Sequence, residues 1–226
     1  MSYNTFAKFY DTLTENVEYK KRVDYISSFF KRYADKCDTV LDLACGTGSV
    51  SKYLSDLGYN VIGLDLSDEM LTVASSKQIK NAMFIKGDMT NFELPHKVDC
   101  CVCSLDSINH LKDIVEVKKC FDCVYNSLND GGVFVFDVNT VYKHKNVLGN
   151  NTFVFDEEDF FLSWDNEYLG DNTVRILLDF FVYNGKNYDR FSEEFNEKAY
   201  SVNELKSVLN NFNIIGIYDE LNLDDI

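Results

Sequence analysis

Three aspartates each interrupt or follow an apolar run of the sequence, and their carboxylates could bind a ligand. Asp42 interrupts the first run, Asp65 ends the second and Asp88 follows the third. If the runs are parallel strands, their carboxyl ends meet at one edge of a sheet, where such sheets bind ligands. Ionised carboxylates accept hydrogen bonds from hydroxyl and amino groups and attract cations. The pattern therefore favours a ligand that carries these groups.

The first run passes into a turn that contains Gly46 and Gly48. Glycine adopts positive φ and lets a ligand approach the backbone, and the following helix would point its free N–H groups at that ligand. A dinucleotide fingerprint needs a third glycine where this chain has Ser51. Asp42 would also repel a pyrophosphate, by about 4 kcal/mol at a separation of about 4 Å and an effective dielectric constant near 20. A cationic ligand suits this turn better.

The same stretch resembles the first motif of the class I S-adenosylmethionine-dependent methyltransferases, in which an acid, a small residue and two glycines stand at alternate positions. Asp42, Ala44, Gly46 and Gly48 match that motif. The resemblance implies that Asp42 and the turn hold the methionine end of S-adenosylmethionine, and that the acids after the second and third runs hold its nucleoside. It implies a cofactor site of Asp42, Ala44, Gly46, Gly48, Asp65, Leu66, Met70, Asp88, Met89 and Ser104.

Two points about the nucleoside end stay open in the sequence. Asp65 lies 17 residues after Gly48, close to the spacing at which an acid reaches a nucleoside ribose. A nicotinamide-dependent oxidoreductase would use the same acid, although it leaves Asp42 unexplained. Met70 could touch the adenine or simply pack in the core.

The loop 105–111 follows a fourth apolar run and should face the methionine end of the cofactor. It is similar to a stretch of the amino-sugar N-methyltransferases in which a histidine acts near the accepting amine, and His110 matches that histidine. Imidazole could take the proton that an amine loses. The resemblance also implies catalytic roles for Tyr3 and Tyr10, on an N-terminal helix that folds over the cofactor. Helix capping by His110 and core packing by Tyr10 are the structural alternatives.

The residues above need a scaffold of alternating strands and helices. Apolar residues at helical spacing predict helices over 3–13 and 18–35 before the first strand. The alternation predicts an α/β fold, a Rossmann-like, doubly wound and mostly parallel sheet. The first strand is expected at the start of the stretch 39–51, and the next strands over 61–65, 82–85, 98–104 and 133–137. The expected helices between them run from the glycine turn to Gly58, from a cap at Ser67, and over 113–128.

Strand periodicity replaces helical periodicity after the fifth strand. We expect a methyltransferase domain of residues 1–138 plus 200–226 and an inserted antiparallel β lid of residues 139–199. Asn184-Gly185 predicts a type I′ hairpin turn within the insertion. A strand module for protein contacts is the alternative. The expected strands are 152–155, 160–168, 174–183 and 188–199, and the residues expected to line an acceptor pocket are Trp164, Arg175, Tyr188 and Arg190.

The C-terminal part begins with a capping box, Ser201 to Glu204, which predicts a helix to about residue 211. A sixth strand is expected over 212–221. The resemblance implies a seventh, antiparallel strand beside it, and nothing strand-like follows Leu221. We therefore expect that the natural chain continues beyond Ile226 or that strand six pairs otherwise, with a second chain for example, in a monomer or weak homodimer.

Composition limits the partners. The chain has 226 residues, 46% of them hydrophobic, and a net charge of -15, which disfavours nucleic acid despite small basic clusters at 20–22 and 143–145. No run approaches the roughly 18 apolar residues of a membrane span, and a cytoplasmic protein is expected. The seven cysteines are expected to be reduced small hydrophobes rather than metal ligands, since neighbours on one strand face opposite ways.

The sequence thus predicts an S-adenosylmethionine-dependent methyltransferase that moves a methyl group to nitrogen or oxygen of a small-molecule acceptor by in-line displacement. The enclosing insertion and the acidic charge favour a small, amino-bearing acceptor. Three alternatives remain: a methyltransferase acting on a tRNA base, a nonenzymatic S-adenosylmethionine-binding protein, and the nicotinamide-dependent enzyme.

Overall fold

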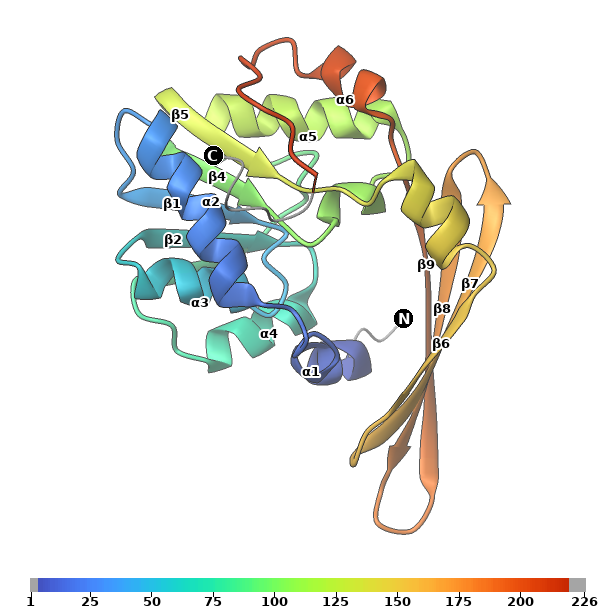
Figure 1. Ribbon diagram of the computed structural model, residues 1–226. Helices are drawn as coiled ribbons and strands as arrows, with labels where there is room; N and C mark the ends of the chain where they lie inside the picture. Colours follow the sequence, from blue (N-terminus) through green and yellow to red (C-terminus); the bar gives the residue numbers. More distant parts are fainter. Residues whose placement is uncertain (1–3, 220–226) are drawn as a thin grey trace.

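The computed structural model describes residues 4–219, and its larger part is a parallel sheet with helices on both faces (Figure 1). The five strands pair in the order β3-β2-β1-β4-β5, and all neighbouring pairs are parallel. This confirms the predicted α/β fold, and the strand order reverses between β1 and β4, the switch point where such sheets bind ligands. The strands are β1 Thr39–Leu43, β2 Asn60–Asp65, β3 Ala82–Lys86, β4 Val98–Cys103 and β5 Leu128–Phe136.

The two faces of this sheet have separate cores, because alternate side chains of a strand point in opposite directions. Leu41 and Leu43 pack with the inward face of α5, whereas Val40 and Val102 pack with α2 and α3. Ser67 caps α4 as predicted, by accepting a hydrogen bond from the Met70 N–H. No helix within residues 4–219 has the length and apolar content needed to cross a membrane. The helices are α1 Asn4–Leu13, α2 Tyr19–Tyr33, α3 Ser49–Asp56, α4 Asp68–Ser76, α5 Ile114–Ser127 and α6 Val202–Val208.

The insertion is the predicted antiparallel sheet, with strand order β6-β7-β8-β9. Its inner face packs against α1, which lies between the two sheets (Figure 1): the Phe9 ring centroid is 4.6 Å from that of Phe160 and 6.1 Å from that of Phe180. A π-helix that the sequence analysis did not predict, η2 Lys143–Leu148, joins β5 to this sheet. The strands are β6 Thr152–Asp156, β7 Phe160–Gly170, β8 Thr173–Tyr183 and β9 Tyr188–Lys198.

The hairpin between β8 and β9 turns at the predicted place but not as a type I′ turn. That turn needs positive φ at both central residues, and only Gly185 has it, at +91°. The loop has four residues, and the Asn184 side chain shapes it by accepting hydrogen bonds from the N–H groups of Lys186 and Asn187. The asparagine thus acts through its side chain rather than through a left-handed backbone.

The predicted sixth strand is wrong for residues 212–219, which form no strand; the rest of that prediction lies outside the described residues. Phe212 packs against Phe134 and Tyr125, with ring centroids 5.8 and 5.6 Å away, whereas Tyr218 packs against Phe29 of α2 at 5.1 Å. The segment therefore crosses the edge of the sheet instead of running along it. Among the described residues, β5 is an edge strand.

Candidate active site

The glycine turn after β1 is joined to the end of β2 by Asp65. One Asp65 oxygen accepts a hydrogen bond from the Gly46 N–H at 2.8 Å, and the other accepts from the Ser67 N–H at 2.9 Å. Gly48 has φ +77°, and a Cβ there would lie 2.9 Å from the Phe84 ring, so only glycine fits this position. The carboxyl ends of β1 and β2 therefore lie close together, as predicted.

Asp42 lies beneath the turn and is 2% exposed. Its carboxylate accepts a hydrogen bond from the Ser51 hydroxyl at 2.5 Å. Burial raises the pKa of Asp42 to about 7, with a further rise from Asp65, against the lowering effect of the Ser51 hydrogen bonds. The residue predicted to attract a cation is thus a carboxyl group that holds its proton more readily than a surface aspartate does.

A small cavity of about 30 Å³ separates this turn from α1. The predicted cofactor residues Asp42, Ala44, Gly46 and Ser104 line it, together with Tyr10, and it has room for little more than a water molecule. The other predicted cofactor residues lie around the turn or further along the strand ends. Leu66 is 67% exposed, Met70 is buried in the core, Asp88 is exposed in its own turn, and Met89 packs against the core.

Helix α1 is bound to the turn by Asp11. Its carboxylate accepts hydrogen bonds from the hydroxyls of Thr47, at 2.6 Å, and Ser49, at 3.1 Å, and forms an ion pair with Lys77 at 2.7 Å. Burial by itself raises the pKa of Asp11, but the hydrogen bonds from Lys77, Thr47 and Ser49 and the lysine charge lower it below its usual value. Ionised Asp11 therefore holds α1 against the turn through these contacts.

Tyr10 lies at the centre of the site. Burial, and then the neighbouring groups Tyr19, Asp106 and Asp65, raise the pKa of Tyr10 well above its usual value. Its phenol therefore stays protonated at neutral pH, so Tyr10 can align an acceptor but cannot remove a proton as a phenolate. Tyr3, the other predicted tyrosine, lies outside the described residues.

Asp137, at the end of β5, organises the loop after β4. It accepts hydrogen bonds from the Ser104 hydroxyl and from the N–H groups of Leu105 and Asp106, at 3.0, 3.1 and 2.6 Å, and pairs with Arg22 at 2.6 Å. These bonds hold Leu105 and Asp106 at φ +58° and +52°, a conformation that non-glycine residues rarely adopt. Asp137 was not predicted as a site residue, although it is a strand-end acid like Asp42 and Asp65.

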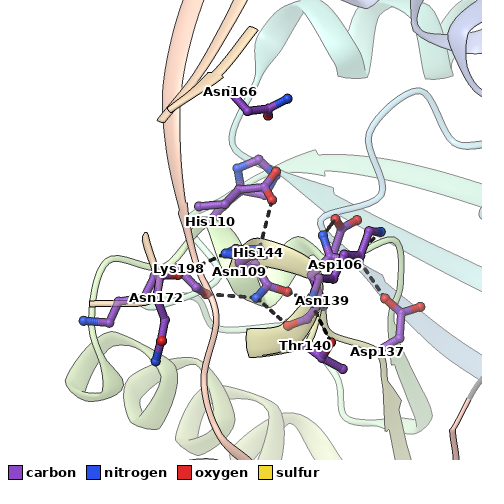
Figure 2. Close-up of polar contacts among 12 residues, drawn as sticks. Asp106, Asn109, His110, Asp137, Asn139, Thr140, His144, Asn166, Asn172 and Lys198 are labelled. Atoms are coloured by element: carbon purple, nitrogen blue, oxygen red, sulfur yellow. Dashed lines mark hydrogen bonds and ion pairs between the residues drawn. The ribbon is translucent and has the colours of Figure 1, made fainter. Parts of the chain in front are cut away.

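Asp106 lies in this loop beside other acids. Figure 2 shows it with Asn139, whose side-chain amide donates a hydrogen bond to it, and with Asp137. Burial, and then the charges of Glu197 and Asp137, raise the pKa of Asp106 to about 6. Lys143 and His110 act in the opposite direction. The loop therefore presents a concentration of negative charge that a cation would relieve.

His110 ends the short 3-10 helix η1, Ser107–His110, and is 46% exposed in its side chain. It does not cap α5, because Asp113 accepts the hydrogen bonds from the first N–H groups of that helix. Its Nε2 lies 3.7 Å from Oε1 of Glu197, a residue of β9 that sequence reasoning did not select.

A second, larger cavity opens beside the first, and Tyr10, Ser104 and Leu105 line both. His110, Asp106 and Glu197 form polar parts of its wall, and the insertion contributes Trp164 and Phe195.

Of the four insertion residues predicted to line an acceptor pocket, only Trp164 lines this cavity. Arg175 and Arg190 lie on the outer face of the sheet, where they pair with Glu167 and Asp179. Tyr188 is 63% exposed, beside the hairpin tip.

Three comparisons place this geometry among known proteins. A family described as "Methyltransferase domain" matches residues 40–132. A Bacillus subtilis protein named as a methyltransferase, YqeM, is 34% identical over 218 residues, which cover 93% of this chain and 85% of that protein. The crystal structure of an S-adenosylmethionine-dependent methyltransferase from Clostridium acetobutylicum superposes with a TM-score of 0.80 at 39% identity, over 92% of this chain and 85% of that one.

A more distant relative carries a substrate in its name. The dTDP-3-amino-3,6-dideoxy-alpha-D-glucopyranose N,N-dimethyltransferase of Streptomyces fradiae is 30% identical over 132 residues, which cover 57% of this chain and 51% of that protein.

Proposed function

The chain belongs to the S-adenosylmethionine-dependent methyltransferases, and from this we propose that it transfers the methyl group to an amine nitrogen of a small acceptor. The observation that carries the proposal is the group of acids beside His110 on the wall of the second cavity. Asp106 and Glu197 favour a cationic or amino-bearing acceptor, and the pKa of Asp106, about 6, reflects charge that such an acceptor would neutralise.

The two cavities divide the roles of the residues. The turn residues Asp42, Ala44 and Gly46 bind the methionine end of S-adenosylmethionine, and Asp65 and Asp88 bind its nucleoside. This division is supported by the lining of the first cavity and by the contact of Asp65 with the turn. Bound there, the cofactor supplies the methyl group on a positively charged sulfur.

The acceptor lies in the second cavity. Tyr10, shared by both cavities, aligns the acceptor with the cofactor as a neutral phenol, and His110 takes the proton that the amine loses. The insertion, residues 139–199, closes the acceptor side as a lid, which is supported by Trp164 and Phe195 on the cavity wall.

The proposal is tested with methyl-labelled S-adenosylmethionine and the small-molecule fraction of a bacterial extract. One half of the fraction is first treated with an amine-selective acetylating reagent, and the dTDP-amino sugar named for the Streptomyces relative serves as a defined additional acceptor. We expect label to enter small molecules, and acetylation of the amines to abolish this. Equal labelling after acetylation would show that the acceptor atom is not an amine nitrogen.

A further inference from the structure

A single carboxylate lies between two histidines at the junction of the sheet domain and the insertion. Glu197 of β9 has Oε1 at 3.7 Å from His110 Nε2 and Oε2 at 3.6 Å from His144 Nε2. His110 is half-exposed on the cavity wall, whereas His144 is completely buried and the Glu197 side chain is only 8% exposed. Figure 2 shows the two histidines on either side of this junction, His144 close to Asn172.

The protonation state of the His144 ring follows from the contact that its Nδ1 makes. Nδ1 lies 3.0 Å from the backbone carbonyl oxygen of Asn172. A carbonyl oxygen can only accept, so Nδ1 must carry a proton. In a neutral ring Nε2 would then present a lone pair to the Glu197 carboxylate.

Two hydrogen-bond acceptors would thus face each other in a buried place. Neither His144 Nε2 nor Glu197 Oε2 has another hydrogen-bond partner among the described residues. A buried, unsatisfied pair of acceptors is costly, and one proton between the two atoms turns repulsion into a charge-assisted hydrogen bond. The geometry therefore favours a proton shared between His144 Nε2 and Glu197 Oε2, which lie 3.6 Å apart and form the hydrogen bond on closer approach.

We propose that Glu197 is a positioning residue for His110 and that the buried His144 holds the Glu197 side chain in place. With Oε2 engaged by His144, Oε1 accepts from the Nε2–H of His110 when the two draw together. His110 then carries its proton on Nε2 and presents the Nδ1 lone pair to the acceptor. This last step rests on the proposed function.

Methyl transfer to an amine releases one proton, which must be accounted for. The amine nitrogen forms a bond to the methyl carbon as the carbon–sulfur bond breaks, and the N–H proton moves to His110 Nδ1. The imidazolium lies beside the Glu197 carboxylate until it gives the proton to solvent through its exposed edge. Because Glu197 and His144 both belong to the 139–199 insertion, the insertion contributes to the chemistry as well as covering the site.

Two substitutions separate position from charge. In Glu197→Gln the amide must direct its NH₂ group to the His144 Nε2 lone pair, since the Asn172 carbonyl fixes the ring tautomer, and its oxygen then still accepts from His110. In Glu197→Met neither contact is possible. Glu194→Gln is the matched control, because Glu194 lies on the same strand, exposed, on the outer face.

The first readout needs no activity. Nitrogen NMR of the imidazole rings at neutral pH should show His144 with protons on both nitrogens in the native protein and in Glu194→Gln. In Glu197→Gln and Glu197→Met it should show the Nδ1–H tautomer, which is the minor form of free histidine. A neutral His144 in the native protein, or one unchanged by both substitutions, would overturn the shared proton.

The second readout is methyl transfer to the amine acceptor. We expect Glu197→Met to lower kcat by about 10- to 100-fold and Glu197→Gln to retain most of it, with S-adenosylhomocysteine affinity equal in all variants. Equal losses in the two variants would refute a positioning role. If the native protein methylates no amine, the proposed function fails, whereas the NMR result still decides whether Glu197 and His144 share a proton.

Discussion

The raised pKa of the buried Asp42 carboxyl predicts that cofactor binding depends on pH. Its pKa of about 7 lies above the usual value of an aspartate, so at pH 6 most of it is protonated. A cationic cofactor favours the ionised form, and binding must then release a proton. Binding should therefore weaken as the pH falls below 7, by up to about tenfold per pH unit.

This prediction is checked by calorimetry of S-adenosylmethionine binding between pH 5.5 and 8, in buffers of different ionisation enthalpy. Asp42→Asn is the control, since its amide oxygen can still accept from Ser51. The variant should bind more weakly at pH 8 and show less pH dependence. Native affinity that is constant over this range would mean that Asp42 does not sense the cofactor's charge.

Residues were predictable from the sequence where a local pattern marks them. The strand-end position identified Asp42 and Asp65, and the same signal was available for Asp137. Glu197 carries no such signal, because it lies 87 residues after His110 and meets it only when the insertion folds back onto the loop. His144 was assigned to a basic surface cluster, but the π-helix turns it into the core.

At the scale of elements, α1 contacts both parts of the molecule. Its Asp11 binds the glycine turn, and its Phe6 and Phe9 pack on the insertion. Because the first cavity has room for little more than a water molecule, we expect α1 to shift when a cofactor binds there. Asp11→Asn removes the ion pair with Lys77 and weakens the hydrogen bonds from Thr47 and Ser49. A loss of about 0.5–1.5 kcal/mol corresponds to a roughly 2- to 12-fold faster release of S-adenosylhomocysteine.

Stopped-flow fluorescence of Trp164, the single tryptophan of the chain and part of the cavity wall, measures this release. Asp24→Asn is the control, since Asp24 forms an exposed ion pair with Lys20 on α2. Its release rate should equal that of the native protein. An equal rate in Asp11→Asn would show that the contacts of Asp11 do not limit the release of S-adenosylhomocysteine.

Elements were predictable where periodicity is local. The strands of both sheets lie close to the predicted ranges, because burial on one or two faces leaves a clear pattern. The exception is β5, which begins at Leu128, so that residues 129–132, predicted as a turn, belong to the strand. The segment 212–219 is also rich in apolar residues, but it does not pair with the free edge of β5, and its aromatic rings pack on Phe134 and Phe29 instead. The π-helix has no period that the sequence displays.

At the scale of the whole molecule, the net charge of -15 is not offset by a basic face at the two clusters that the sequence offered. Lys20, Lys21 and Arg22 pair with Asp24, Glu18 and Asp137 respectively. In the second cluster, His144 is buried and Lys143 donates to Asn139.

A polyanion therefore finds no neutralising patch in these segments. We expect no retardation of tRNA by the protein in a gel-shift measurement at about 0.15 M salt, and no transfer of label to it. Retardation at this salt concentration would revive the tRNA alternative.

The position of Tyr10 on the wall of both cavities also predicts the order of the kinetic mechanism. Tyr10 belongs to both cavities, so its placement over a bound cofactor completes the wall that the acceptor meets. The acceptor should therefore bind second and its methylated product should leave first. Calorimetric titration of the acceptor should give heat in the presence of S-adenosylhomocysteine and none in its absence. Equal acceptor affinity in both titrations would indicate random binding, with the two cavities formed independently.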